Sequence, residues 1–128
     1  MLAQRITQSL QGHPELELAI LFGSQATGRA RLDSDVDVAV LAARPLDTAQ
    51  KMSLITDIAE ATGLSVDLVD IRTAGEPLLG QVMTHGQRLI GSAETQSHWL
   101  CRHLVDAEDF MPYVRRMLAE RRKAWTGT

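Results

Sequence analysis

The sequence predicts an α/β fold: a small mixed β-sheet, helices packed on one face of it, and a C-terminal helical tail. Three apolar stretches, at 16–22, 35–41 and 65–71, have the length and pattern of strands. Around them, apolar residues recur at three- and four-residue spacing, which indicates amphipathic helices. The 128 residues correspond to one domain, with a core over about 14–91 and a helical tail over about 93–125.

The first part of the chain alternates between helix and strand patterns. Residues 3–11 form an amphipathic helix in this interpretation, with Ile6 and Leu10 four positions apart. The run LELAILF at 16–22 begins with alternation and becomes continuously apolar, which suits a strand buried on at least one face. Gly23 ends this strand.

A small-residue segment and a polar loop separate the first two strands. Residues 24–28 are expected to start a short helix, with Ser24 or its neighbour at the N-cap. The loop at 29–34 is polar, and the run DVDVAVL at 35–41 then alternates acid and valine before it becomes wholly apolar. This second strand therefore has one polar face at its beginning.

The remaining elements follow from apolar periodicity and from glycine and proline positions. The expected elements are a helix at 46–61, a strand at 65–71, a short helix at 77–84, an edge strand at 86–91, and a long helix from 93. Pro112 is expected to kink or break the last helix, because proline lacks a backbone donor and clashes with the preceding turn.

Composition and charge exclude several classes of protein. Apolar residues at 45% and charged residues at 23% are ordinary for a globular domain. A net charge of −3 gives no general attraction to nucleic acid or to an anionic membrane, so direct nucleic-acid binding is not expected. No apolar run approaches the length of a membrane span, and the N-terminus has no secretory pattern. With one cysteine, Cys101, the chain is expected to be cytoplasmic.

The acidic pair Asp35 and Asp37 is the first candidate site. On a strand the two side chains point the same way, about 7 Å apart. Two carboxylates at the edge of an apolar core repel each other and lose hydration, and a divalent cation compensates for both effects. Oxygen ligands favour magnesium or manganese. If the strand at 65–71 lies beside the second strand, Asp67 completes a three-carboxylate site for two metal ions.

Gly23 and Ser24 provide a place for an anion next to these carboxylates. Glycine lets the backbone approach a phosphate closely, and Ser24 adds its hydroxyl and the N–H groups of a helix start. Taken singly, an Asp-x-Asp pair is more often a solvated strand edge, and a Gly-Ser pair is more often a turn. The combination, with ten intervening residues and a strand on each side, favours a nucleoside triphosphate site.

The run GSQATGRARLDSDVDVAV, followed by SVDLVDI, resembles the signature of the polymerase β-like nucleotidyltransferase superfamily, and most closely its minimal nucleotidyltransferase (MNT) proteins. The resemblance covers roughly 16–91. It implies that Gly23 and Ser24 hold the triphosphate of ATP and that Asp35 and Asp37 bind Mg²⁺. It also implies that an aspartate on the following strand is a metal ligand and base, and the match here is Asp67. The apolar neighbours Val66, Leu68 and Val69 support Asp67 over Asp70.

Two positions depart from the family pattern. Thr27 stands where many relatives carry arginine, and Leu32 stands where many carry proline. These differences concern the shape of the nucleotide loop rather than the metal site.

The resemblance also implies a partner. Many MNT proteins are antitoxins of HEPN-domain ribonuclease toxins and transfer AMP from ATP to a toxin tyrosine. The expected function is therefore a Mg-dependent protein adenylyltransferase in complex with a cognate HEPN toxin. Two alternatives stay open: an antitoxin that acts by binding alone, and a nucleotidyltransferase for a small-molecule acceptor, for which 128 residues leave little room.

Overall fold

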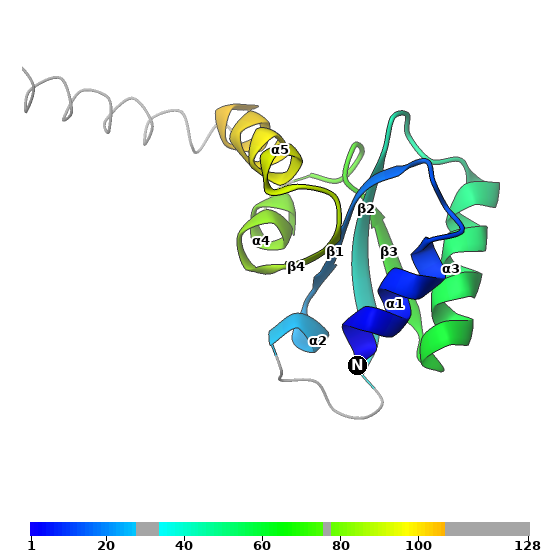
Figure 1. Ribbon diagram of the computed structural model, residues 1–128. Coiled ribbons are helices and arrows are strands. Elements are labelled where there is room, and N and C mark those ends of the chain that lie inside the picture. The colour runs from blue at the N-terminus through cyan, green and yellow to red at the C-terminus, as the bar shows by residue number, and fades with distance from the viewer. Residues whose placement is uncertain (28–33, 76–77, 107–128) are drawn as a thin grey trace, which may run out of the picture.

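The computed structural model describes residues 1–27, 34–75 and 78–106, and a four-stranded mixed sheet organises them (Figure 1). The strands are β1 (Leu16–Phe22), β2 (Val36–Ala42), β3 (Val66–Asp70) and β4 (Gln87–Ile90), in the spatial order β3-β2-β1-β4. β1 pairs antiparallel with both β2 and β4, whereas β2 and β3 are parallel. The predicted mixed sheet is confirmed.

Five helices connect and cover the strands in the described part of the chain. They are α1 (Leu2–Leu10), α2 (Ser24–Thr27), α3 (Thr48–Thr62), α4 (Leu78–His85) and α5 (Ala93–Asp106). α3 is the crossover that parallel strands require, and it joins β2 to β3. Its ends are well defined: Asp47 and Gln50 form a reciprocal capping box at the start, and Gly63 at φ 71° caps the end.

The helices lie on both faces of the sheet, and not on one face as expected from the sequence. One apolar cluster joins α1 and α3 to alternate residues of β1 and β2, and a second joins α4 and α5 to the other alternate residues. Figure 1 shows α1 and α3 on one side of the sheet and α4 and α5 on the other. The reason is that β1 and β2 are apolar on both faces over most of their length, so both faces must be covered.

Parts of the expected tail lie outside the described residues. Of the tail, these parts are the continuation of the last helix beyond residue 106 and the break at Pro112. Residues 29–33 of the loop expected at 29–34 also lie outside the described residues. None of the helices that the structure describes is both long and apolar enough to cross a membrane.

Candidate active site

The three predicted aspartates lie at the beginning of two neighbouring strands. Asp35 immediately precedes β2 and is exposed, whereas Asp37 is the second residue of β2 and is half-buried. Parallel register places Asp67 of β3 opposite Asp37, and the Val36 N–H donates to the carbonyl of Ser65 at 2.8 Å just before this pair. Residues directly paired across a sheet present their side chains on the same face. The prediction that the strand bearing Asp67 lies alongside β2 is confirmed.

Gly23 lies on the other side of Asp37. Phe22, the last residue of β1, is the antiparallel partner of Asp37, and Gly23 follows with φ at +74°. A Cβ built on Gly23 would come 2.3 Å from Oδ2 of Asp37, so no side chain fits between this backbone and the carboxylate. The Gly23-Ser24 turn and the acidic pair are therefore neighbours in space, although ten residues separate them along the chain.

The electrostatics of the site are those of crowded carboxylates. Partial burial raises the pKa of Asp37 above its ordinary value, and the negative charges of Asp67 and Asp35 raise it further. Within the described residues, no three His, Cys, Asp or Glu side chains are already arranged to hold a metal ion. The carboxylates thus interact electrostatically without forming a complete ligand set among themselves.

Gln25 lies next to the Gly23-Ser24 turn, and the sequence does not single it out. Its side-chain amide donates a hydrogen bond to the backbone carbonyl of Ser34 at 3.1 Å. This bond ties the Gly23-Ser24 turn to the residue that precedes Asp35. No pattern in the sequence indicates such a bond, since a glutamine in a short polar segment has many possible partners.

Asp70 has a structural role, in contrast to Asp67. It is buried in the core, where Oδ2 accepts the backbone N–H of Leu46 at 2.9 Å and Oδ1 accepts that of Arg72 at 3.0 Å. Its carboxylate therefore satisfies two donors where the chain leaves β2 and β3. Asp67 is exposed and lies beside Asp37.

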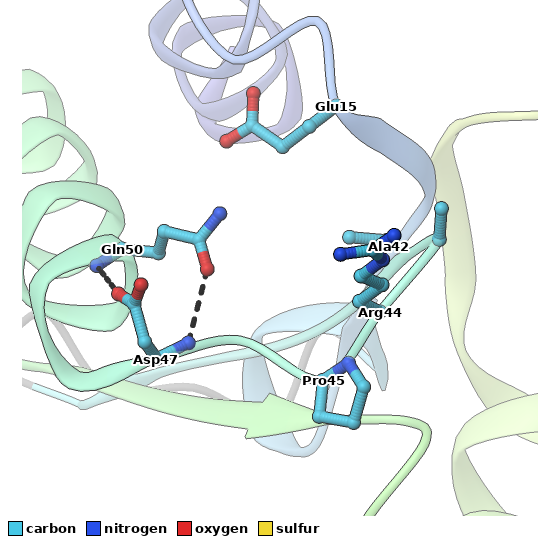
Figure 2. Close-up of a pocket in the computed structure, with 7 residues that line it drawn as sticks. Glu15, Ala42, Arg44, Pro45, Asp47 and Gln50 are labelled. Carbon is cyan, nitrogen blue, oxygen red and sulfur yellow. Dashed lines mark hydrogen bonds between the residues drawn. The ribbon is translucent and has the colours of Figure 1, made fainter.

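A cavity of about 390 Å³ opens at the opposite end of the sheet, away from the three aspartates. Glu15, Arg44, Asp47 and Gln50 line it, together with the end of β2 (Figure 2). Asp47 and Gln50 are occupied in the capping box of α3. These polar groups order the start of the helix, and the cavity is no part of the candidate site.

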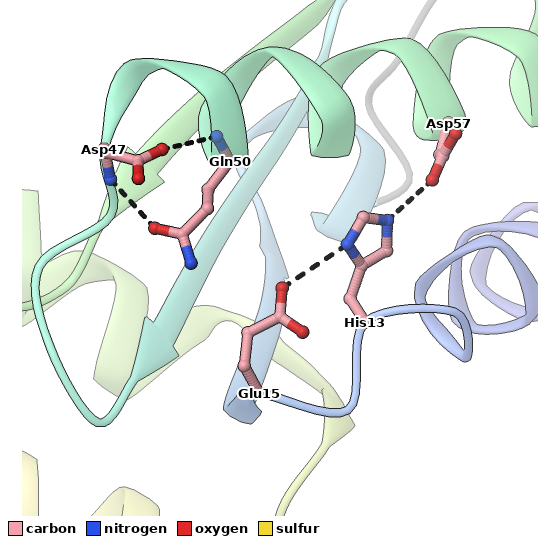
Figure 3. Close-up of polar contacts among 5 residues, drawn as sticks. All are labelled: His13, Glu15, Asp47, Gln50 and Asp57. Carbon is pink, nitrogen blue, oxygen red and sulfur yellow. Dashed lines mark hydrogen bonds and ion pairs between the residues drawn. The ribbon is translucent and has the colours of Figure 1, made fainter.

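A second polar cluster joins the turn after α1 to α3. His13 Nε2 lies 2.6 Å from Oδ2 of Asp57, and its Nδ1 lies 3.5 Å from a carboxylate oxygen of Glu15 (Figure 3). The ring bridges the helix that follows β2 and the turn that precedes β1. It helps to hold the helices on that face of the sheet and lies apart from the aspartates.

Comparison with known proteins gives related sequences and folds. The family model "Polymerase beta, Nucleotidyltransferase" matches residues 4–95. The protein adenylyltransferase MntA of Shewanella oneidensis is 43% identical over 81 residues, which are 63% of this chain and only 58% of that relative's length.

Solved structures agree over almost the whole chain. A chain from a toxin–antitoxin structure with AMP-PNP superposes with a TM-score of 0.73 at 31% identity, covering 99% of this chain and 98% of that one. A chain from the complex of tri-AMPylated Shewanella oneidensis HEPN toxin with MNT antitoxin superposes with a TM-score of 0.66 at 30% identity, covering 98% and 94%. Since the family model spans 4–95 and the fold matches as well, this chain belongs to the polymerase beta nucleotidyltransferase family.

Proposed function

We propose that this chain is a Mg-dependent nucleotidyltransferase that moves AMP from ATP to a hydroxyl group of a cognate HEPN ribonuclease toxin, and that it thereby acts as the antitoxin. The observation that carries the proposal is the position of Asp37 between Gly23 on one side and Asp67 on the other. This arrangement brings the Gly23-Ser24 turn and a cluster of carboxylates together at one end of the sheet, and transfer from a nucleoside triphosphate requires both an anion-binding group and metal ligands.

The donor set fits Mg²⁺, and we propose that Asp35, Asp37 and Asp67 hold two such ions with help from phosphate oxygens. The three side chains offer only carboxylate oxygens, which suit this hard cation. The raised pKa of Asp37 reflects burial and repulsion by Asp67 and Asp35, and a bound cation would relieve that repulsion. When bound, Mg²⁺ would stabilise negative charge on the reacting phosphate and the leaving group.

The residues of the chain then have separate roles. Gly23 and Ser24 hold the β- and γ-phosphates through backbone approach and the helix start. Asp67 accepts the proton of the acceptor hydroxyl as that oxygen attacks the α-phosphorus. The bond between the α-phosphorus and the α–β bridging oxygen breaks, and pyrophosphate departs on the side of Gly23 and Ser24. The acceptor keeps AMP as a phosphodiester.

The relatives support a protein acceptor. The relative with 43% identity is named a protein adenylyltransferase, and one matched structure holds a tri-AMPylated HEPN toxin with an MNT antitoxin. We propose a tyrosine of such a toxin as the acceptor. ATP as the substrate and a single cysteine favour a cytoplasmic location.

Transfer of label tests the proposal directly. The chain is mixed with Mg²⁺, α-labelled ATP and the product of the adjacent reading frame, which the proposal expects to be a HEPN protein. We expect label on the HEPN protein, and we expect chelation of Mg²⁺ or the pair Asp35→Asn and Asp37→Asn to abolish it. Label that persists in the double variant would contradict the mechanism.

The same experiment separates the alternatives. If the double variant still neutralises the HEPN ribonuclease without transferring label, the chain acts by binding alone. If label moves only to a small molecule in a cell extract and never to the HEPN protein, the protein acceptor is wrong.

A further inference from the structure

The surface around Trp99 of α5 gathers arginine side chains. The guanidinium carbon of Arg72, which follows β3, lies 5.1 Å from the centre of the Trp99 ring, and that of Arg102 lies 5.3 Å from it. Both distances are within the range of cation–π attraction. Trp99 is half-buried against the core, whereas Arg102 is exposed. We call the surface formed by Arg72, Arg88, Trp99 and Arg102 the α5 arginine face.

Among the side chains that the structure describes, none of the recorded ion pairs involves an arginine of this face. Arg72 donates to the carbonyl of Ala42, and Arg88 donates from β4 to the side-chain carbonyl of Gln96 at 3.0 Å, one helical turn before Trp99. In the part of the chain that the structure describes, every ion pair involves His13. Guanidinium groups that are stacked and oriented, with no carboxylate partner among the described side chains, are suited to bind carboxylates of another molecule.

This local charge is not a sign of a basic protein. The chain has 16 acidic against 13 basic residues, with a net charge of −3, so a positive face is a local exception. In the described part of the chain, the recorded cation–π contacts are those of Arg72 and Arg102 with Trp99. Tryptophan and arginine together are the residue types enriched where protein interfaces gain most of their binding free energy.

The Arg72 end of the α5 arginine face is separate from the candidate active site. Arg72 bonds to Ala42 at the end of β2, whereas Asp37 lies near the beginning of that strand. The five-residue separation corresponds to roughly 17 Å along a strand. A partner bound at Arg72 therefore leaves the aspartates open to the nucleotide and to the acceptor hydroxyl.

We propose that the α5 arginine face docks an acidic surface of the HEPN partner, an inference that rests on the proposed function. Three guanidinium groups suit a cluster of carboxylates, each of which can accept two parallel N–H bonds from arginine. RNA is the less suitable occupant, because its affinity comes from neutralising many phosphates along a basic track. The α5 arginine face instead supplies a compact group of three arginines.

Equilibrium binding tests this assignment without any need for catalysis. The parent is the chain with Asp35→Asn and Asp37→Asn, so that no AMP is transferred, and its Kd for the HEPN protein is measured by calorimetry at low and at physiological salt. Arg102→Glu in this background is compared with Arg5→Glu, which changes net charge equally on an exposed residue of the opposite helical layer. Melting temperatures verify that each variant is folded.

We expect Arg102→Glu to raise the Kd about tenfold at low salt and less at physiological salt, because the attraction is electrostatic. Arg5→Glu should leave the Kd unchanged. Arg102→Lys keeps the charge but loses the planar fork, so its Kd should lie between those of the parent and Arg102→Glu.

Equal Kd values for the two glutamate variants would overturn the docking face while the proposed partner stands. Failure of the parent to bind the HEPN protein would overturn both the docking face and the proposed HEPN partner. Unchanged HEPN affinity in Arg102→Glu, with loss of binding to a short RNA, would assign the face to nucleic acid instead.

Discussion

The carboxylate of Asp37 lies against Gly23, and a Cβ built on this glycine would come 2.3 Å from Oδ2 of Asp37. The contact joins the end of β1 to the beginning of β2, which is the point where the Gly23-Ser24 turn and the carboxylates meet. Gly23 therefore has two reasons to be glycine: its backbone at φ +74° and the absence of room for a side chain. The two reasons can be tested separately, because Gly63 also has a positive φ but has room for a side chain.

The change Gly23→Ala should abolish most of the transfer activity. The new methyl group must displace the Asp37 carboxylate, and misplacement of a reacting or binding group by about 1 Å can lower the rate on the order of a hundredfold. Steady-state transfer of labelled AMP measures the loss. We expect the melting temperature to fall as well, because a left-handed backbone strains alanine by about 1–2 kcal/mol.

Gly63→Ala is the matched control. Gly63 ends α3 with φ at +71°, and a Cβ built there meets no atom within 4 Å. We expect a similar loss of stability, with transfer per folded molecule unchanged. If Gly63→Ala impaired transfer as strongly as Gly23→Ala, the effect would come from general destabilisation and not from the contact with Asp37.

The raised pKa of Asp37 predicts that removal of its charge, as in Asp37→Asn, increases folding stability, and that the gain depends on pH. Burial and the neighbouring carboxylates raise this pKa above 3.8 in the folded state, so the folded chain binds the proton more tightly than the unfolded chain. The contribution of Asp37 to folding stability therefore falls as the pH rises from 3.8 through the raised pKa. In the absence of metal ions, Asp37→Asn should raise the melting temperature at pH 7 and have less effect near pH 3.5.

Magnesium should reverse the order of the melting temperatures, so that the parent chain melts at a higher temperature than Asp37→Asn. A cation bound by the carboxylates stabilises the folded parent chain by mass action, and Asp37→Asn weakens that binding. Melting curves at pH 7 with increasing Mg²⁺ measure the effect. A parent chain whose melting temperature does not respond to Mg²⁺, with or without ATP, would contradict a metal site at Asp37.

Much of this arrangement is predictable from the sequence because the strands carry a strong signal. The acid–valine alternation that begins at Asp35 indicates a strand with one polar face, and the Gly-Ser spacing indicates a turn before it. The adjacency of Asp67 was a prediction that the register of β2 and β3 confirms. The roles of the aspartates stay a prediction.

Other features depend on distances that a linear pattern does not contain. The hydrogen bond from Gln25 to Ser34 and the stacking of Arg72 on Trp99 join residues through the fold alone. The coverage of both sheet faces was recoverable in principle, because β1 and β2 are continuously apolar where a sheet with one wet face would alternate.

Gln25→Ala should lower catalytic efficiency through the nucleotide rather than through the partner. Loss of the bond to Ser34 loosens the link between the turn and the residue that precedes Asp35. A hydrogen bond contributes about 0.5–1.5 kcal/mol, which corresponds to roughly a two- to tenfold change. We expect the KM for ATP to rise with the KM for the acceptor unchanged. Gln87→Ala, an exposed change on β4, is the control and should alter neither value.

Asp67 and Asp70 form a pair that separates catalysis from stability, although they lie three residues apart on the same strand. Asp70→Asn leaves one of two backbone donors, Leu46 or Arg72, without a carboxylate oxygen inside the core, and an unsatisfied buried group costs about 1–3 kcal/mol. We therefore expect a clear loss of unfolding free energy in urea, with transfer per folded molecule retained. Asp67→Asn changes an exposed side chain and should leave unfolding nearly unaltered while it abolishes transfer. Chemical denaturation together with the labelling assay measures both quantities, and the reverse pattern, with activity lost at Asp70 and kept at Asp67, would assign the base and metal ligand to Asp70 instead.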